Sequence, residues 1–277
     1  MQSSSPQSPS SLAGRSVLVV GAGGGGIGTD TALCLAEAGA RVVAADWIEE
    51  RVDEVVALLA DRGHECVGLV ADARDPEQAN DLVARSIEAV GALRGLVNVV
   101  GGTLPGTWQR MEDYTDELYD EVLNLNLRTA FLTTRATARH MLEVGDGGSI
   151  VNFSSVSGLR AAPYHGLYGA AKAAVGSLTR TMAVEWGYSG IRVNAIAPSR
   201  VQTPRVVRGG GTREEAIANP LRRNIEVREV ANVALFLISD MSSALTGQTY
   251  NVDAGVTAES PAGPAKAFAV RLPGGKS

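Results

Sequence analysis

The sequence lacks the features that mark several classes of protein. Only two of its 277 residues are cysteines, so we interpret Cys34 and Cys66 as buried thiols and expect neither a disulfide nor a metal site. No apolar run approaches the length that spans a bilayer. The first residues do not combine a basic patch with an apolar segment, so we expect no secretory signal.

Charge is also not concentrated anywhere in the sequence. The formal net charge is −5, and the basic residues do not cluster. This balance argues against binding to nucleic acid or to an anionic membrane surface. A cytoplasmic enzyme with a small-molecule substrate is therefore the expectation.

The composition that remains is that of an ordinary globular protein, with 45% apolar and 20% charged residues. We predict one domain over residues 14–257, because a chain of this length buries a full core. Residues 1–13 are rich in Ser, Pro and Gln and are predicted to be disordered. Residues 258–277, broken by Pro and Gly, are predicted to form a tail that is loose or docked on a neighbouring subunit.

Apolar strands alternate with helical stretches along this domain. Such alternation puts helices on both faces of a sheet, so it predicts an α/β fold with a doubly wound parallel sheet. One helix has a clear start, where Asp75 is the cap, Pro76 takes the first position and Gln78 completes a capping box. The seven predicted strands cover residues 17–20, 41–45, 66–70, 96–100, 149–153, 192–197 and 249–252.

The first predicted strand leads into a loop with six glycines, followed by a helical stretch that Gly39 suits as a C-terminal cap. Glycines let a backbone approach phosphates closely, and a helix N-terminus offers N–H groups and a positive dipole. The loop alone does not distinguish a phosphate cradle from a flexible turn, because a match is nearly guaranteed in so glycine-dense a segment. Two patterns fit, one on Gly21, Gly23 and Gly26 and a tighter one on Gly24, Gly26 and Gly28.

An acidic residue, Asp46, ends the second predicted strand, twenty residues after Gly26. In a dinucleotide-binding fold this spacing places a carboxylate on the adenosine ribose hydroxyls, where it repels the 2′-phosphate of NADP. The nearest basic residue downstream is Arg51. We therefore predict NAD rather than NADP. The alternative is that Asp46 only caps the helix that starts near Ile48.

Tyr168 and Lys172 are four residues apart in a helical stretch, so their side chains share one face. A phenol has a pKa of about 10, and a neighbouring ammonium lowers it toward the range of a useful base. Ser155 lies thirteen residues before Tyr168 at the end of a strand, where its hydroxyl can hold the substrate oxygen. The apolar stripe that seats this helix comprises Ala171, Val175, Leu178, Met182 and Trp186.

Together these motifs resemble the short-chain dehydrogenase/reductase family, and within it members similar to 3-oxoacyl-ACP reductases. The resemblance covers nearly all of residues 14–257 and implies a Rossmann-like fold in a single domain. Its motifs are GAGGGGIG, ADA at 71–73, LVNVVGG at 96–102, NLNLRTAF at 124–131, GSIVNFSSVSG at 148–158, YGAAK, IRVNAIAPSRVQTP at 191–204 and LTGQTYNVDAG at 245–255.

The resemblance implies a role for each matching residue. Ser155, Tyr168 and Lys172 match the catalytic set, and Asn126 matches the asparagine that holds a water and links the lysine to solvent. Asp72 and Ala73 would lie along the adenine, Asn98 would secure the strand beside the cofactor, and Thr203 would meet the nicotinamide carboxamide. The cofactor-binding set is Gly21, Gly23, Gly26, Ile27, Gly28, Asp46, Asp72, Ala73, Asn98, Gly101, Tyr168, Lys172, Pro198, Val201 and Thr203.

Three positions depart from the family pattern. The glycine loop is one residue longer than G-x-x-x-G-x-G, and we expect a residue between Gly23 and Gly26 to absorb the bulge. Val99 and Val100 replace the usual Asn and Ala, which makes the cofactor wall more apolar. Ser199 follows Pro198 in place of glycine, which restricts that turn.

By the same resemblance, the substrate pocket is expected to form from the segments that begin at Gly101, Leu159 and Ser199. Three consecutive glycines at 209–211 indicate a mobile lid near 204–224. We interpret the arginines around them (Arg205, Arg208 and Arg213) as solvated charges rather than substrate ligands. Tyr164 and His165 are candidates for substrate contact, but we expect His165 to be an incidental hydrogen-bonding residue and not a catalytic one.

The sequence thus predicts an NAD(H)-dependent oxidoreductase that interconverts a secondary alcohol and a ketone, with Tyr168 as acid and base. A catalytically idle nucleotide-binding sensor or scaffold is one alternative, and an epimerase or dehydratase of the same family is another. The resemblance also implies a homotetramer, in which helical segments near 117–142 and 166–186 pair across a two-fold axis.

Overall fold

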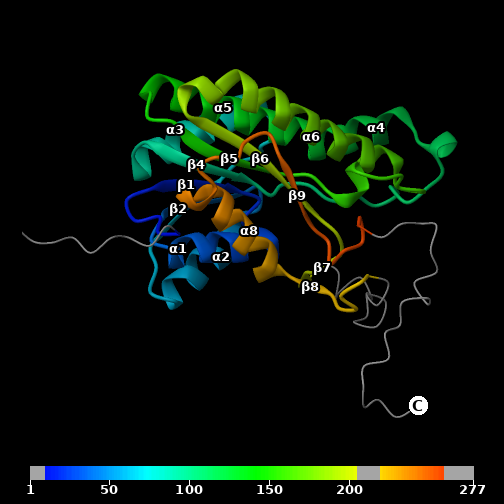
Figure 1. The fold of residues 1–277 in the computed structure, drawn as a ribbon, viewed down its shortest axis with the longest axis horizontal. Helices are drawn as coiled ribbons and strands as arrows, with labels where there is room; N and C mark the ends of the chain where they lie inside the picture. Colours follow the sequence, from blue (N-terminus) through cyan, green and yellow to red (C-terminus); the bar gives the residue numbers. More distant parts are fainter. Residues whose placement is uncertain (1–9, 205–218, 259–277) are drawn as a thin grey trace, which may run out of the picture.

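A seven-stranded parallel sheet forms the centre of the molecule, as predicted (Figure 1). The structure is a computed structural model, and it describes residues 10–204 and 219–258. The sheet has the order β3-β2-β1-β4-β5-β6-β9. Its strands are β1 Ser16–Val20, β2 Arg41–Asp46, β3 Cys66–Val70, β4 Leu93–Asn98, β5 Gly148–Phe153, β6 Ile191–Pro198 and β9 Thr249–Val252.

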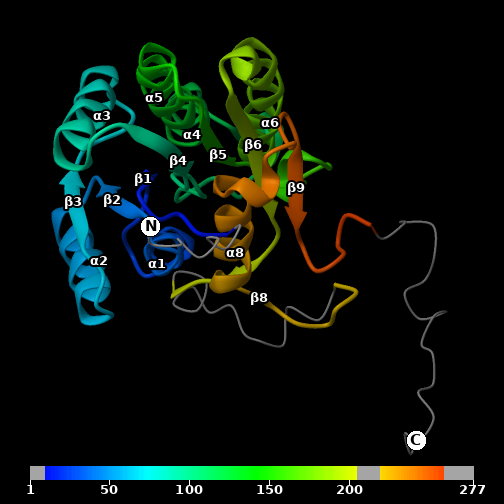
Figure 2. The same ribbon diagram turned by 60° about the vertical axis from the view of Figure 1, so that its left-hand side comes forward.

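Helices cover both faces of this sheet (Figures 1 and 2). One layer contains α1 Ile27–Glu37, α2 Glu49–Asp61 and α8 Val227–Ile238. The other contains α3 Pro76–Val90, α4 Asp116–Leu123, α5 Thr129–Val144 and α6 Gly166–Trp186. Every helix in the described part of the chain is too short or too polar to span a bilayer.

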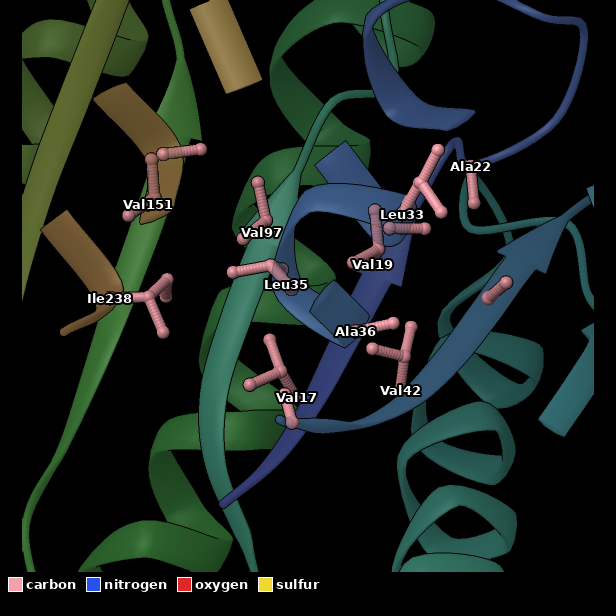
Figure 3. Packing of buried hydrophobic residues seen from close by; sticks show 14 of the residues in the cluster. Val17, Val19, Ala22, Leu33, Leu35, Ala36, Val42, Val97, Val151 and Ile238 are labelled. Atoms are coloured by element: carbon pink, nitrogen blue, oxygen red, sulfur yellow. The ribbon is translucent and has the colours of Figure 1, made fainter. Parts of the chain in front are cut away.

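The alternation of side chains along the central strands divides the core between the two layers. On β1, Val17 and Val19 pack toward α1 and α8, and Figure 3 shows Val19 beside Leu33 of α1. Leu18 and Val20 point to the opposite face and join the cluster formed with α3, α5 and α6. Burial on both faces explains why Val17–Val20 are all apolar, while the buried hydroxyl of Ser16 at the start of β1 donates to the Val90 carbonyl at 2.7 Å.

The strand order reverses between β1 and β4. The chain runs from β1 outward through β2 to β3 and then returns to β4 on the other side of β1. In open α/β sheets a crevice forms beyond the carboxyl ends of the strands at this switch point, and ligands bind there. The glycine loop after β1 and the 99–110 segment after β4 both begin at that point.

Strand β4 begins earlier than the sequence predicts. It covers Leu93–Asn98 instead of 96–100, because Arg94 and Gly95 hide its start in an otherwise apolar pattern. A Cβ at Gly95 would lie 2.9 Å from a Val17 methyl carbon, so only glycine fits against β1 there. Beyond Asn98, Val100 leaves the sheet and packs against Gly21 of the glycine loop.

The predicted helical segment 117–142 is also wrong in one respect. A five-residue π-helical turn, Asn124–Arg128, separates α4 from α5. Such turns insert an extra residue into a helix and are frequent at functional sites. Here the turn contains Asn126.

The capping box predicted for α3 forms only in half. Asp75 accepts hydrogen bonds from the N–H groups of Glu77 and Gln78, and Pro76 takes the first position, as predicted. The side chain of Gln78, however, accepts the N–H of Asp72, at 3.0 Å, rather than that of Asp75. Gln78 therefore connects the helix start to the segment after β3.

The predicted boundaries of the domain need one correction. Leu12, which belongs to the segment predicted to be disordered, is fully buried and donates its N–H to the Ala38 carbonyl at 2.8 Å. The domain therefore begins before residue 14. Most of the predicted lid (205–218) and of the predicted tail (259–277) lies outside the described residues. The segments that flank the lid form a two-stranded parallel sheet, β7 Val201–Gln202 with β8 Ile225–Glu226.

Candidate active site

The glycine loop closes back on the first turn of α1. Gly21, Gly24 and Gly25 have φ values of 82°, 83° and 68°, so the extra residue is absorbed at Gly24–Gly25 in left-handed backbone. The Thr29 hydroxyl accepts the N–H of Gly25 at 3.0 Å and donates to the Ala22 carbonyl at 2.6 Å. One threonine thus fixes both ends of the loop.

Two other glycines of the loop, Gly23 and Gly28, are required because a side chain has no room there, and not because of their backbone conformation. A Cβ at Gly28 would lie 1.9 Å from the Gly21 carbonyl oxygen, and one at Gly23 would lie 2.5 Å from the Arg51 Cβ. Helix α1 begins at Ile27 after Gly26, which has no side chain to cap it. The first-turn N–H groups therefore remain available to an anion, and the loop fits the pyrophosphate of a dinucleotide.

Asp46 lies against this loop. Its carboxylate accepts the N–H of Gly23 at 3.2 Å and that of Ile48 at 3.3 Å, and the residue is only 8% exposed. Helix α2 begins at Glu49, with Ile48 as its N-cap. Asp46 therefore connects the glycine loop to the start of α2, and the two interpretations of this residue are compatible.

Three side chains gather beyond the ends of β2 and β3. Asp72 accepts charge-assisted hydrogen bonds from the Arg74 guanidinium at 2.8 and 2.7 Å, and this contact lowers the pKa of Asp72. The same guanidinium lies 4.7 Å from the centre of the exposed Trp47 ring. Ala73, between Asp72 and Arg74 in the sequence, is buried. The resemblance expects Asp72 and Ala73 to lie along the adenine, and that role remains a prediction.

Lys172 is buried beneath the Tyr168 ring. Its ammonium donates to the Phe153 carbonyl at the end of β5, at 2.8 Å, and lies 5.9 Å from the centre of that ring. The Ser154 hydroxyl holds the Lys172 carbonyl at 2.8 Å. Because water is excluded, burial lowers the pKa of Lys172 from its usual 10.5 to about 8.

Asn126 and the segment after β4 complete this buried wall. The Asn126 side chain bonds both backbone groups of Gly102, accepting its N–H at 2.8 Å and donating to its carbonyl at 3.0 Å. A Cβ at Gly101 would lie 2.6 Å from the Lys172 Nζ and 2.8 Å from the Asn126 Oδ1. Only glycine therefore allows the chain to pass over both side chains.

Ser155 follows β5 and caps a short 3-10 helix, Val156–Gly158, by accepting the N–H of Ser157 at 3.2 Å. This helix packs on α6 through glycine. A Cβ at Gly158 would lie 2.7 Å from the Lys172 backbone, and one at Gly169 would lie 2.7 Å from the Ser157 carbonyl oxygen. The close packing holds Ser155 beside the first turns of α6, which contain Tyr168.

Asn98, at the end of β4, joins a buried hydrogen-bond network that connects neighbouring elements of the fold. It donates to Asn152 of β5 and to the Thr134 hydroxyl, both at 2.9 Å, and accepts the Thr133 hydroxyl at 2.6 Å. The residue is 2% exposed, so this network fixes β4, β5 and α5 behind the crevice.

The segment after β6 lies over the glycine loop. Pro198 ends β6, and Thr203 lies 3.7 Å from where a Cβ at Gly26 would be. The Val201 side chain packs in the core with Ile225, and its contact with a cofactor remains a prediction. The glycine loop, Asp46, the Gly101–Gly102 segment and Lys172 thus all lie at or just beyond the carboxyl ends of the sheet strands.

Several contacts of this site carry no prediction from the sequence. Arg51 packs against Gly23, the backbone of Gly102 orients Asn126, and Thr29 closes the glycine loop. Spacing in the sequence carries no signal for the last two, because both depend on a backbone bond across a turn.

Comparison with known proteins agrees with this geometry. The chain matches the model of the enoyl-(acyl carrier protein) reductase family over residues 21–257. It is 35% identical over 254 residues to a 2,5-dichloro-2,5-cyclohexadiene-1,4-diol dehydrogenase of Sphingobium indicum, covering 90% of this chain and 99% of that one. It is 36% identical over 247 residues to a 3-oxoacyl-[acyl-carrier-protein] reductase of Thermotoga maritima, covering 88% and 98%.

A crystal structure of an Agrobacterium tumefaciens relative with bound NADP is 34% identical, covers 91% of this chain and 99% of its own, and has a TM-score of 0.82. The chain therefore belongs to the short-chain dehydrogenase/reductase family. It is an NAD(P)-dependent oxidoreductase that acts on alcohols or ketones.

Replacing Lys172 with methionine should stabilise the protein and abolish its activity. The depressed pKa means that the unfolded chain binds more protons than the folded one between about pH 8 and 10.5, so the ammonium is destabilising below pH 8. Losing the hydrogen bond from Lys172 to the Phe153 carbonyl offsets part of this gain. We therefore expect the free energy of unfolding of the variant at pH 7 to be about 1–2 kcal/mol higher than that of the wild type.

Denaturant titrations from pH 7 to 10 measure this effect. The extra stability of Lys172→Met over the wild type should shrink as pH rises toward 10. The kcat of the variant should be about 100-fold or more below that of the wild type. A variant that is less stable than the wild type at pH 7 would show that the ammonium stabilises the fold.

Proposed function

We propose that this protein interconverts a secondary alcohol and a ketone with NAD(H), with Tyr168 as the acid and base. One observation carries the proposal: the buried Lys172 ammonium lies 5.9 Å from the centre of the Tyr168 ring. In a water-poor site such a charge stabilises the phenolate far more than it would in solution. The dinucleotide, when bound, supplies the acceptor or donor of hydride.

The side chains divide the remaining work. Tyr168 takes the hydroxyl proton when an alcohol is oxidised and returns it when a ketone is reduced. The Ser155 hydroxyl orients the substrate oxygen. Asn126, held at both ends by Gly102, lies beside the ammonium and connects it toward solvent. These residues come from β5, α6 and the π-helical turn, which are rigid elements and keep the groups aligned.

The preference for NAD rests on Asp46. Its carboxylate faces the glycine loop through Gly23, where it repels the charge of a 2′-phosphate. Arg51 lies beside it, with its Cδ and Nε 3.8 Å from where a Cβ at Gly24 would be. The A. tumefaciens relative binds NADP, so the family accommodates both dinucleotides. We propose that Asp46 overrides Arg51 in this chain.

A homotetramer is the proposed assembly. Large apolar side chains are exposed on the layer of α4, α5 and α6, a face that the figures show on one side of the sheet (Figures 1 and 2). Unpartnered apolar groups of this kind are typical of subunit contacts. They are Tyr119, Phe131, Leu142, Val144 and Val184. The cytoplasmic location expected from the sequence remains a prediction.

Tyr168→Phe tests the proposed function directly. Absorbance at 340 nm would follow NADH formation with a panel of secondary alcohols, and we expect turnover to fall by about 100-fold or more because the proton acceptor is gone. Dinucleotide affinity should change little, since the ring is retained. Full turnover in this variant would refute the role of Tyr168, and product formation without net NADH in the wild type would favour an epimerase or dehydratase.

Asp46→Ala should shift the protein toward NADP. With the carboxylate gone, Arg51 faces the position of the 2′-phosphate unopposed, and we expect the ratio of kcat/KM for NAD over NADP to fall by about 100-fold. The double variant Asp46→Ala/Arg51→Ala should gain much less NADP use than the single variant, because it has no cation beside the 2′-phosphate. An unchanged ratio in the single variant would contradict the assignment.

A further inference from the structure

His165 lies between the catalytic tyrosine and the loop that follows β4. It is the N-cap residue of α6, three positions before Tyr168, and it is only 4% exposed. Its ring is 4.6 Å from the Tyr168 ring, edge-on at 74°, and 4.4 Å from the Trp108 ring. His165 is thus the middle member of a row of three rings at the site.

The Nδ1 atom of this ring is buried, and no hydrogen-bond partner for it lies among the described residues. A buried polar atom without a partner is costly, so it is a candidate for completion by a ligand. The side chain also does not cap α6, although it occupies the cap position. Burial lowers the pKa of His165, so the ring is a neutral donor and acceptor at pH 7.

The surrounding backbone holds this arrangement. Tyr164 has a φ of 60°, an uncommon conformation for a tyrosine, and its carbonyl accepts the N–H of Gln109 at 3.0 Å. Tyr114 donates to the Thr107 carbonyl at 2.6 Å. Both bonds fix the backbone on either side of Trp108, a residue that is 70% exposed although its ring contacts that of His165. The tryptophan therefore offers an apolar surface beside the orphaned nitrogen.

We propose that His165 Nδ1 binds a second oxygen of the substrate, on the carbon next to the reacting one, and that the preferred substrates are vicinal diols and α-hydroxy ketones. This rests on the proposed function, in which Tyr168 bonds the reacting oxygen. Oxygens on neighbouring carbons are about one hydrogen-bond length apart, which suits two adjacent rings. Trp108 covers the carbon skeleton.

The chemistry at the reacting carbon is unchanged by this contact. Its hydride passes to the nicotinamide dinucleotide, and its hydroxyl proton passes to Tyr168, so a diol yields a hydroxy ketone. The second hydroxyl keeps its proton and all its bonds. His165 is therefore a residue that positions the substrate and sets its specificity.

Matched substrates that differ by one hydroxyl test the proposal. With the full-length protein and NAD, kcat/KM would be measured for trans-cyclohexane-1,2-diol against cyclohexanol and for butane-2,3-diol against butan-2-ol. We expect the wild type to favour the diol in each pair. His165→Phe keeps the ring contacts and removes both nitrogens, and it should lower the diol-to-monohydric ratio by about tenfold or more.

Two further variants separate binding from structure. His165→Asn places a polar atom near the Nδ1 position and should restore part of the ratio. His64→Phe, a matched change just after α2 and outside the site, should leave the ratio as it is. An unchanged ratio in His165→Phe, an equal loss on both members of a pair, or a wild type that prefers the monohydric alcohols would overturn the proposal. None of these results would touch the role of Tyr168, whereas a fully active Tyr168→Phe would refute the proposed function instead.

Discussion

The site depends on an ammonium group that the fold removes from water. Lys172 is held by the carbonyl of Phe153 and covered by the Tyr168 ring, and burial makes its charge costly. The glycines around it allow this close approach, since a Cβ at Gly101 would collide with the ammonium and one at Gly158 would collide with its backbone. The same exclusion of water that makes the ammonium destabilising also strengthens its electrostatic interaction with the neighbouring Tyr168 phenol.

The doubly wound sheet explains how groups from distant parts of the chain meet there. Reversal of strand order between β1 and β4 opens the crevice, and the glycine loop, Asp46 and the segment after β4 all follow strands that end at this edge. The π-helical turn then supplies Asn126 from a separate helix pair. The dinucleotide half and the proton-transfer half of the site are thus built on the same row of strand ends.

The sequence was most informative where periodicity or spacing reflects a local structure. Apolar runs located all seven strands, and the stripe along Gly166–Trp186 matched α6. The sequence was misleading where tertiary contacts determine the structure. Arg94 and Gly95 masked the start of β4, and Leu12 is buried although its segment has the composition of a disordered one. Gln78 accepts the N–H of Asp72 instead of that of the cap residue Asp75. The position of His165 made it a candidate for substrate contact, but the sequence favoured an incidental hydrogen bond and gave no sign that its Nδ1 lacks a partner among the described residues.

The central claim is tested most directly by the ionisation of Lys172 itself. The sequence contains three lysines, and the other two are Lys266 and Lys276, so lysine labelled with carbon-13 at Cε would give a simple spectrum whose Lys172 signal disappears in Lys172→Met. We predict that this signal titrates with a pKa of about 8. Titration of all three signals near the usual value of about 10.4 would contradict the account, because the ammonium would then be in contact with water.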